Sequence, residues 1–91
     1  MDKLFEWDKE KNAKLIQQRG ISFEGVVSAI ESGDVLDILK GRGRYGHQKQ
    51  YLVQINQYLY LVPFVEDADK IFLKTIIPSR KLTKRWLLGG I

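Results

Sequence analysis

The sequence predicts an α+β domain: an antiparallel sheet of four to five strands, with two N-terminal helices on one face and a short C-terminal helix. Two capped helical segments come early in the chain, runs of apolar strand residues separated by short turns follow, and a strand leads into a basic helix at the end. The resulting order over residues 1–91 is β-α-α-β-β-β-β-α. Helices followed by hairpin-linked strands are typical of a single α+β domain.

The N-terminal part is predicted to form one short strand and two helices. Residues 4–7 alternate apolar and charged side chains, as an amphipathic strand does. Asp8 is a good N-cap for a helix over residues 9–19, and Gly20 suits its C-terminus. Ser22 can cap a second helix, which Gly33 ends. The apolar face of that second helix, at the spacing i, i+3, i+4 and i+7, would cover the sheet through Phe23, Val26, Val27 and Ile30.

The remaining strands are predicted over residues 34–40, 49–56, 58–65 and 70–77. Asn56 and Gln57 can form a tight turn between two of them. The strand over 58–65 is nearly all apolar, so we expect it to be central. Pro63 within this strand indicates a bulge or a position that needs no ladder hydrogen bond.

Composition excludes several classes of function. The 91-residue chain has no cysteine and one histidine, which rules out disulfides, the usual zinc sites and a cysteine nucleophile, and fits a cytoplasmic location. No apolar run approaches the ~20 residues of a membrane span, and the acidic N-terminus is unlike a signal peptide. The glycine-rich segment 41–48 lacks the Gly-Lys-Ser/Thr of a nucleotide-binding loop. We expect neither a metal nor another cofactor.

Charge is distributed unevenly along the chain. Residues 1–37 contain five basic and eight acidic residues, whereas residues 38–91 contain ten basic and three acidic ones. Residues 70–91 contain six basic side chains and no acidic one. Such a surface suits a polyanion, and RNA is the partner that we expect.

RNA cleavage by attack of a 2′-OH needs charge on the phosphate and groups that move protons. Arginine and lysine supply the charge, and histidine, tyrosine or lysine can move protons. The predicted catalytic residues are Arg80, Lys81 and His47. The predicted RNA-binding residues, which include one aromatic side chain for stacking on a base, are Arg42, Arg44, Lys49, Tyr51, Lys74, Lys84 and Arg85.

Plainer interpretations stand beside these assignments. Cations on a last helix commonly form a solvated face that complements the helix dipole, and loop arginines commonly only aid solubility. His47 can be an ordinary loop residue. Arg80 is harder to explain in this way, because the dipole disfavours a cation in the first turn of a helix.

Both ends of the chain resemble the BrnT family of bacterial toxins. Phe5-Glu-Trp-Asp8, Lys11-Asn12 and residues 19–24 (Arg-Gly-Ile-Ser-Phe-Glu) are similar to the opening of that family, and residues 76–85 to its ending. The resemblance covers about two-fifths of the chain. Gln18-Arg19 stands where the family has Lys-His, and residues 34–51 do not follow the family pattern.

The resemblance implies a RelE-like fold and a ribonuclease toxin of a type II toxin–antitoxin pair. The implied partner is an antitoxin, commonly of the ribbon-helix-helix type, which also binds operator DNA. Arg80 and Lys81 take the place of the family's C-terminal basic pair, which suits phosphate binding. Lys11 and Asn12 match a motif of the first helix, for which a structural role is equally open.

Three hypotheses follow. The leading one is a toxin that cleaves RNA, either free or ribosome-associated, without a metal and so inhibits translation. The second is a non-catalytic RNA- or protein-binding module whose basic face only docks. The third is a structural subunit whose basic surface neutralises an acidic antitoxin.

Overall fold

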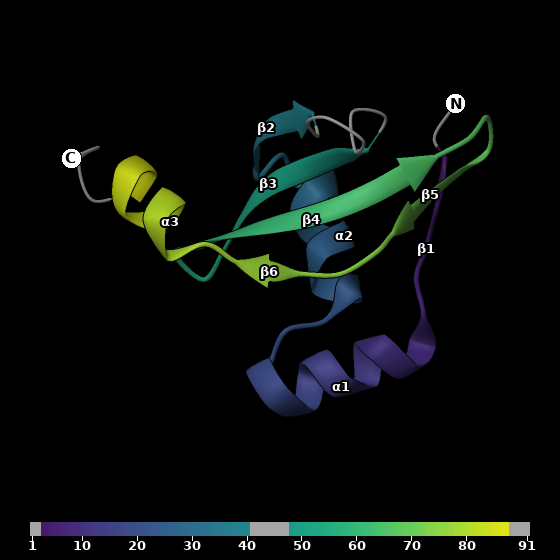
Figure 1. Cartoon of the computed structure of the whole chain (residues 1–91), viewed down its shortest axis with the longest axis horizontal. Coiled ribbons are helices and arrows are strands. Elements are labelled where there is room, and N and C mark those ends of the chain that lie inside the picture. The colour runs from purple at the N-terminus through teal and green to yellow at the C-terminus, as the bar shows by residue number, and fades with distance from the viewer. Residues whose placement is uncertain (1–2, 41–47, 88–91) are drawn as a thin grey trace.

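The computed structural model describes residues 3–40 and 48–87, which form three helices and a six-stranded sheet (Figure 1). No helix in this part of the chain is long and apolar enough to span a membrane. The α+β class and the order of helices and strands are as predicted, with one extra short strand near the C-terminus. The elements in order are β1 (Leu4–Glu6), α1 (Lys9–Arg19), α2 (Phe23–Glu31), β2 (Val35–Lys40), β3 (Lys49–Ile55), β4 (Tyr58–Glu66), β5 (Lys70–Leu73), β6 (Ile77–Pro78) and α3 (Arg80–Leu87).

The strands lie in the order β1-β5-β4-β3-β2, and β6 also pairs with β4. β4 is therefore central, as its apolar sequence predicted. The sheet is mixed, whereas a wholly antiparallel one was expected, because β1 pairs in parallel with β5. The parallel pair joins opposite ends of the chain, and local sequence patterns do not specify such a contact.

The predicted helix caps are all present. The Asp8 carboxylate accepts the N–H groups of Glu10 and Lys11, and Gly20 adopts a left-handed conformation at φ 68°. The Ser22 hydroxyl accepts the N–H of Gly25. These interactions fix both helix starts and the end of α1 at the positions that the sequence indicated.

The β3–β4 hairpin turns at Asn56 and Gln57. Both residues have positive φ angles, 53° and 62°. This is the pattern of a two-residue type I′ turn, whose twist matches the flanking strands. The turn thus forms as predicted, although its second residue is glutamine instead of the usual glycine.

Pro63 explains why the last predicted strand is divided into β5 and β6. The C=O of Pro63 accepts the N–H of Lys74 at 2.8 Å, so the backbone polar groups of Pro63 face this strand. Because proline has no N–H, it cannot donate a hydrogen bond to the neighbouring strand. The pairing with β4 is therefore interrupted between Leu73 and Ile77. Pro78 belongs to β6, so this short strand extends one residue past the predicted end at residue 77.

One face of the sheet packs against the N-terminal helices. In Figure 1, α2 lies behind β3 and β4, and α1 runs along the side of the sheet below them. The Arg19 guanidinium donates to the Ile76 carbonyl at 3.3 Å and so ties the end of α1 to the β5–β6 connection. The core between these layers is formed by Leu15, Ile21, Phe23, Val26, Tyr51, Val53, Val62, Phe64, Ile71, Leu73 and Ile76.

Candidate nucleic-acid interface

Helix α3 carries four cations on one side. Arg80 and Lys84 are four residues apart, as are Lys81 and Arg85, so each pair is adjacent on the helix surface. All four side chains are exposed. Thr83, on the other side of the helix, is only 8% exposed. The helix therefore presents a cationic side to solvent and a different side to the sheet.

Hydrogen bonds fix α3 against the beginning of β4. The Ser79 N–H donates to the Leu59 carbonyl at 2.9 Å, and the Leu59 N–H donates to the Thr83 hydroxyl at 2.9 Å. The Thr83 hydroxyl donates in turn to the Ser79 carbonyl at 2.7 Å. The Ser79 hydroxyl also caps the helix by accepting the Leu82 N–H. Both backbone polar groups of Leu59 are thus bound, and the start of α3 is held in one place.

Sequence reasoning missed Thr83. Its sequence signal is a single threonine on the less charged side of a short basic helix, and a mid-helix threonine commonly bonds a carbonyl one turn earlier. What the sequence could not indicate is the second bond, from Leu59, which lies twenty-four residues away.

Within residues 3–40 and 48–87, the cations of α3 make no ion pair. The ion pairs in this part of the chain are Lys3–Glu66, Lys49–Glu66 and Lys70–Glu6, at 2.8, 3.1 and 3.6 Å. Arg80 lies in the first turn, where the helix dipole opposes a positive charge. The charges of α3 are therefore held close together without carboxylates from the described part of the chain to offset them, and they can bind an external anion.

Lys49 lies far from α3. It pairs with Phe64 across the sheet, whereas α3 is attached at Leu59, about 17 Å along β4 at ~3.3 Å per residue. Its ammonium group binds Glu66, and the hydrogen bonds from Lys3 and Lys49 lower the pKa of that carboxyl group. Lys49 thus belongs to a charge-neutralised cluster at the other end of the sheet.

Tyr51 does not fit its predicted role in RNA binding. The side chain is 7% exposed, and its ring stacks on Phe64 with the centroids 4.2 Å apart. Burial and the nearby Glu66 carboxylate raise the pKa of its hydroxyl group. A ring packed in the core cannot stack on a base, so this assignment is wrong.

The other residues predicted for the site lie in different parts of the chain. Lys74 is exposed in the connection between β5 and β6, one short strand away from α3. Arg42, Arg44 and His47 lie outside the described residues. Asn12, from the resemblance motif, has a structural role: its side chain accepts the Phe23 N–H and donates to the Glu24 carboxylate, both at 2.8 Å. No group of three His, Asp or Glu residues in the described chain could hold a metal ion.

Comparison with known proteins identifies the fold. No family model matches the chain, and no curated protein matches it in sequence. Among solved structures, a histidine-to-glutamine mutant of YafQ from E. coli has 12% sequence identity and a TM-score of 0.53. YafQ from E. coli strain BL21(DE3) has 10% identity and a TM-score of 0.51. Each match covers 89% of this chain and 98% of YafQ. The predicted RelE-like fold is therefore confirmed.

Proposed function

We propose that this protein is a ribonuclease toxin of a type II toxin–antitoxin pair, and that α3 binds the phosphates of its RNA substrate. The observation that carries the proposal is the set of four exposed cations on a helix that hydrogen bonds fix to the sheet. The fold shared with YafQ, a RelE-family toxin, supports the same class of protein. The BrnT-like ends of the sequence favour a BrnT-type member.

In the proposed reaction, the 2′-oxygen of a ribose attacks the adjacent phosphorus and the bond to the 5′-oxygen breaks. One proton leaves the 2′-OH and another is delivered to the 5′-oxygen. Arg80 and Lys81 stabilise the charge that develops on the phosphate, which is the largest part of such catalysis. His47 transfers a proton. Lys84 and Arg85 hold neighbouring phosphates of the same strand, with Lys74, Arg42 and Arg44 positioning the RNA. No step requires a metal.

The proposed partner is a cognate antitoxin of the ribbon-helix-helix type, which neutralises the toxin and links the complex to operator DNA. The basic C-terminal half of the chain gives an acidic antitoxin segment a complementary surface. An antitoxin that covers α3 would prevent RNA from binding there.

The test is growth of bacterial cells after induced expression, with total RNA examined in each culture. The wild type should arrest growth and degrade RNA. Arg80→Ala should do neither, because it removes one phosphate-binding charge and no core contact. Lys14→Ala, which removes an exposed charge from α1, is the matched control and should remain toxic. Normal growth with intact RNA in the wild type would refute the proposal.

A second function, non-catalytic RNA binding, is favoured by one feature. The chain has a single histidine, His47, and none between residues 70 and 91, where the cations are concentrated. A binding module would bind RNA with a salt-dependent affinity and would not cleave it. His47→Ala would then change neither the affinity nor its salt dependence.

A further inference from the structure

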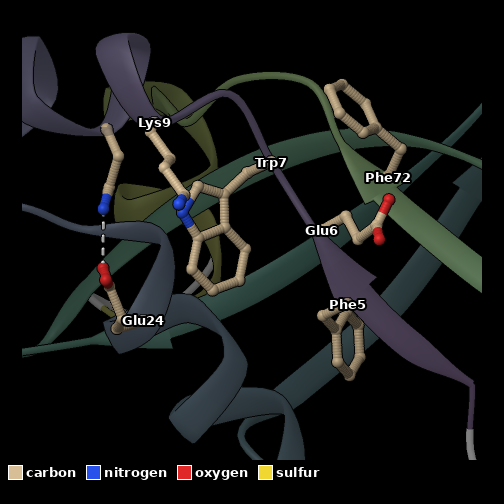
Figure 2. A pocket seen from close by; sticks show the side chains of 7 residues that line it. Phe5, Glu6, Trp7, Lys9, Glu24 and Phe72 are labelled. Atoms are coloured by element: carbon tan, nitrogen blue, oxygen red, sulfur yellow. Dashed lines mark hydrogen bonds between the residues drawn. The ribbon is translucent and has the colours of Figure 1, made fainter.

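A hollow of about 420 Å³ lies beside β1, where the first strand meets the starts of α1 and α2 (Figure 2). Three aromatic side chains, two carboxylates, one ammonium group and one amide surround it. The residues are Phe5, Glu6, Trp7, Lys9, Asn12, Glu24 and Phe72. None of these residues belongs to the proposed RNA site.

The hollow adjoins a free sheet edge. Among the strands of residues 3–40 and 48–87, β1 is the last on its side of the sheet, and the Leu4 N–H donates inward to the Asp69 carbonyl at 3.0 Å. Because successive backbone groups of a strand point to alternate sides, the N–H and C=O of Phe5 point away from β5. A free edge of this kind can hydrogen-bond to a further strand.

The opposite edge is less suited to such pairing. β2 contains a register irregularity between Val35 and Asp37. Bulges of this kind twist a strand and blunt its edge. β1 has a regular register with its neighbour, and it also has the hollow beside it. Strand addition is therefore better accommodated at β1.

The walls of the hollow favour a flat cation. The Trp7 ring is held by stacking on Phe23, with the centroids 5.8 Å apart. Glu24 is fixed by the Asn12 amide, whose hydrogen bond lowers the pKa of the Glu24 carboxyl group. The Glu6 carboxylate has only a loose ion pair, 3.6 Å from the Lys70 ammonium. Two carboxylates thus outnumber the single ammonium of Lys9.

We propose that the β1 edge and this hollow form a docking site for an extended segment of a partner polypeptide that carries an arginine. The segment pairs with β1 as an added strand. Its arginine enters the hollow, where the guanidinium lies against the Trp7 ring and binds the Glu24 carboxylate, while Glu6, on the other side of Trp7, adds negative charge at the rim (Figure 2). Guanidinium groups combine stacking on aromatic rings with bidentate binding of carboxylates, which lysine cannot do.

The two carboxylates also argue against a nucleotide in this place. A phosphate near Glu6 and Glu24 would meet charges of its own sign, and the cations beside them are Lys9 in the lining and Lys70, which is already paired with Glu6. A partner bound here contacts a different part of the molecule from α3, which is attached at the other end of β4.

The site can be tested with the full chain and synthetic pentapeptides. In each peptide valine alternates with other residues, and the central residue is the test residue: arginine, citrulline or glutamate. Trp86→Phe leaves Trp7 as the single tryptophan, so its fluorescence reports binding in the hollow. The arginine peptide should bind at least tenfold more tightly than the citrulline peptide, and the glutamate peptide should not bind. Hydrogen exchange of the Phe5 amide should slow in the complex, while that of the Ile38 amide should not.

The double variant Glu6→Gln, Glu24→Gln should bind the arginine peptide at least tenfold more weakly than the wild type does. Glutamine retains an oxygen that can accept the Asn12 hydrogen bond, so α2 keeps its start. Glu31→Gln, at the exposed end of α2, is the control and should not change the affinity. Equal affinity for arginine and citrulline peptides, an unprotected Phe5 amide, or tighter binding of guanosine monophosphate than of the arginine peptide would overturn the inference. RNA cleavage is not read in this experiment, so its outcome is independent of the proposed function.

Discussion

The basic side chains at the two ends of β4 differ in whether they are paired with carboxylates. At the beginning of β4, α3 presents four basic side chains that make no ion pair within residues 3–40 and 48–87. At the end of β4, Lys3 and Lys49 both bind Glu66. The number of basic residues in a segment therefore does not identify a binding surface. What decides it is whether distant parts of the chain bring carboxylates to those residues.

The largest expected effect is a loss of RNA affinity when charges are removed from α3. Replacing both Arg80 and Lys81 with alanine should weaken single-stranded RNA binding at least tenfold. It should also reduce the slope of log K against log salt by about 1.4, at ~0.7 per phosphate contact. The measurement is fluorescence anisotropy of labelled RNA over a range of salt concentrations.

The matched control removes the same amount of charge from the other end. Lys3→Ala with Lys49→Ala also lowers the net charge by two, but both side chains are bound to Glu66. This variant should leave the salt slope nearly unchanged. Equal losses in the two double variants would mean that RNA responds only to net charge.

The next effect concerns the attachment of α3. Thr83→Val removes the hydroxyl that accepts the Leu59 N–H and leaves that buried donor without a partner, which should cost about 1–3 kcal/mol of unfolding free energy. Thr83→Ser keeps the hydroxyl and should cost less. Urea denaturation measures both. If valine is as stable as threonine, the hydrogen bonds around Leu59 do not hold the helix.

A smaller effect is expected at Tyr51. Tyr51→Phe keeps the ring that stacks on Phe64, so stability and RNA affinity should both remain close to those of the wild type. RNA anisotropy and urea denaturation are again the measurements. A marked loss of RNA affinity in a stably folded Tyr51→Phe protein would show that the hydroxyl reaches the RNA and that the assignment to the core is incomplete.

The smallest effect is the pH dependence at the neutralised end. Hydrogen bonds from Lys3 and then Lys49 lower the pKa of Glu66 below its usual value of 4.5. The folded state thus binds the proton less readily than the unfolded state does. The stability from this cluster is present above pH 4.5 and is lost as the pH falls through the lowered pKa. Glu66→Gln should flatten this part of a stability–pH curve; an unchanged curve would contradict the ion pairs.

Local sequence signals predicted much of the fold. Asp8 and Ser22 cap helices, Asn56 and Gln57 form the hairpin turn, and the apolar strand is central, because each of these features depends on neighbouring residues. Pro63 indicated an interrupted ladder, although the interruption appears in the opposite strand.

Long-range contacts account for what the sequence did not predict. The pairing of β1 with β5, the burial of Tyr51 beneath the helices and the capture of Lys49 by Glu66 all join residues far apart in the chain or on different strands. The candidate site was predicted as one surface, but the described residues divide it between α3, Lys74 and the Glu66 cluster. The hollow at β1 gave no sequence signal, since its residues come from separate segments.

The most direct test of the central claim is chemical-shift mapping of the ¹⁵N-labelled protein with a short RNA that carries 2′-O-methyl groups. The methyl groups block attack by the 2′-oxygen, so the bound RNA stays intact during the experiment. We predict the largest shifts at the amides of residues 79–87 and small shifts at Lys3, Lys49 and Glu66. Shifts concentrated around Glu66 and β1, with α3 unchanged, would contradict the assignment of α3 as the RNA-binding surface.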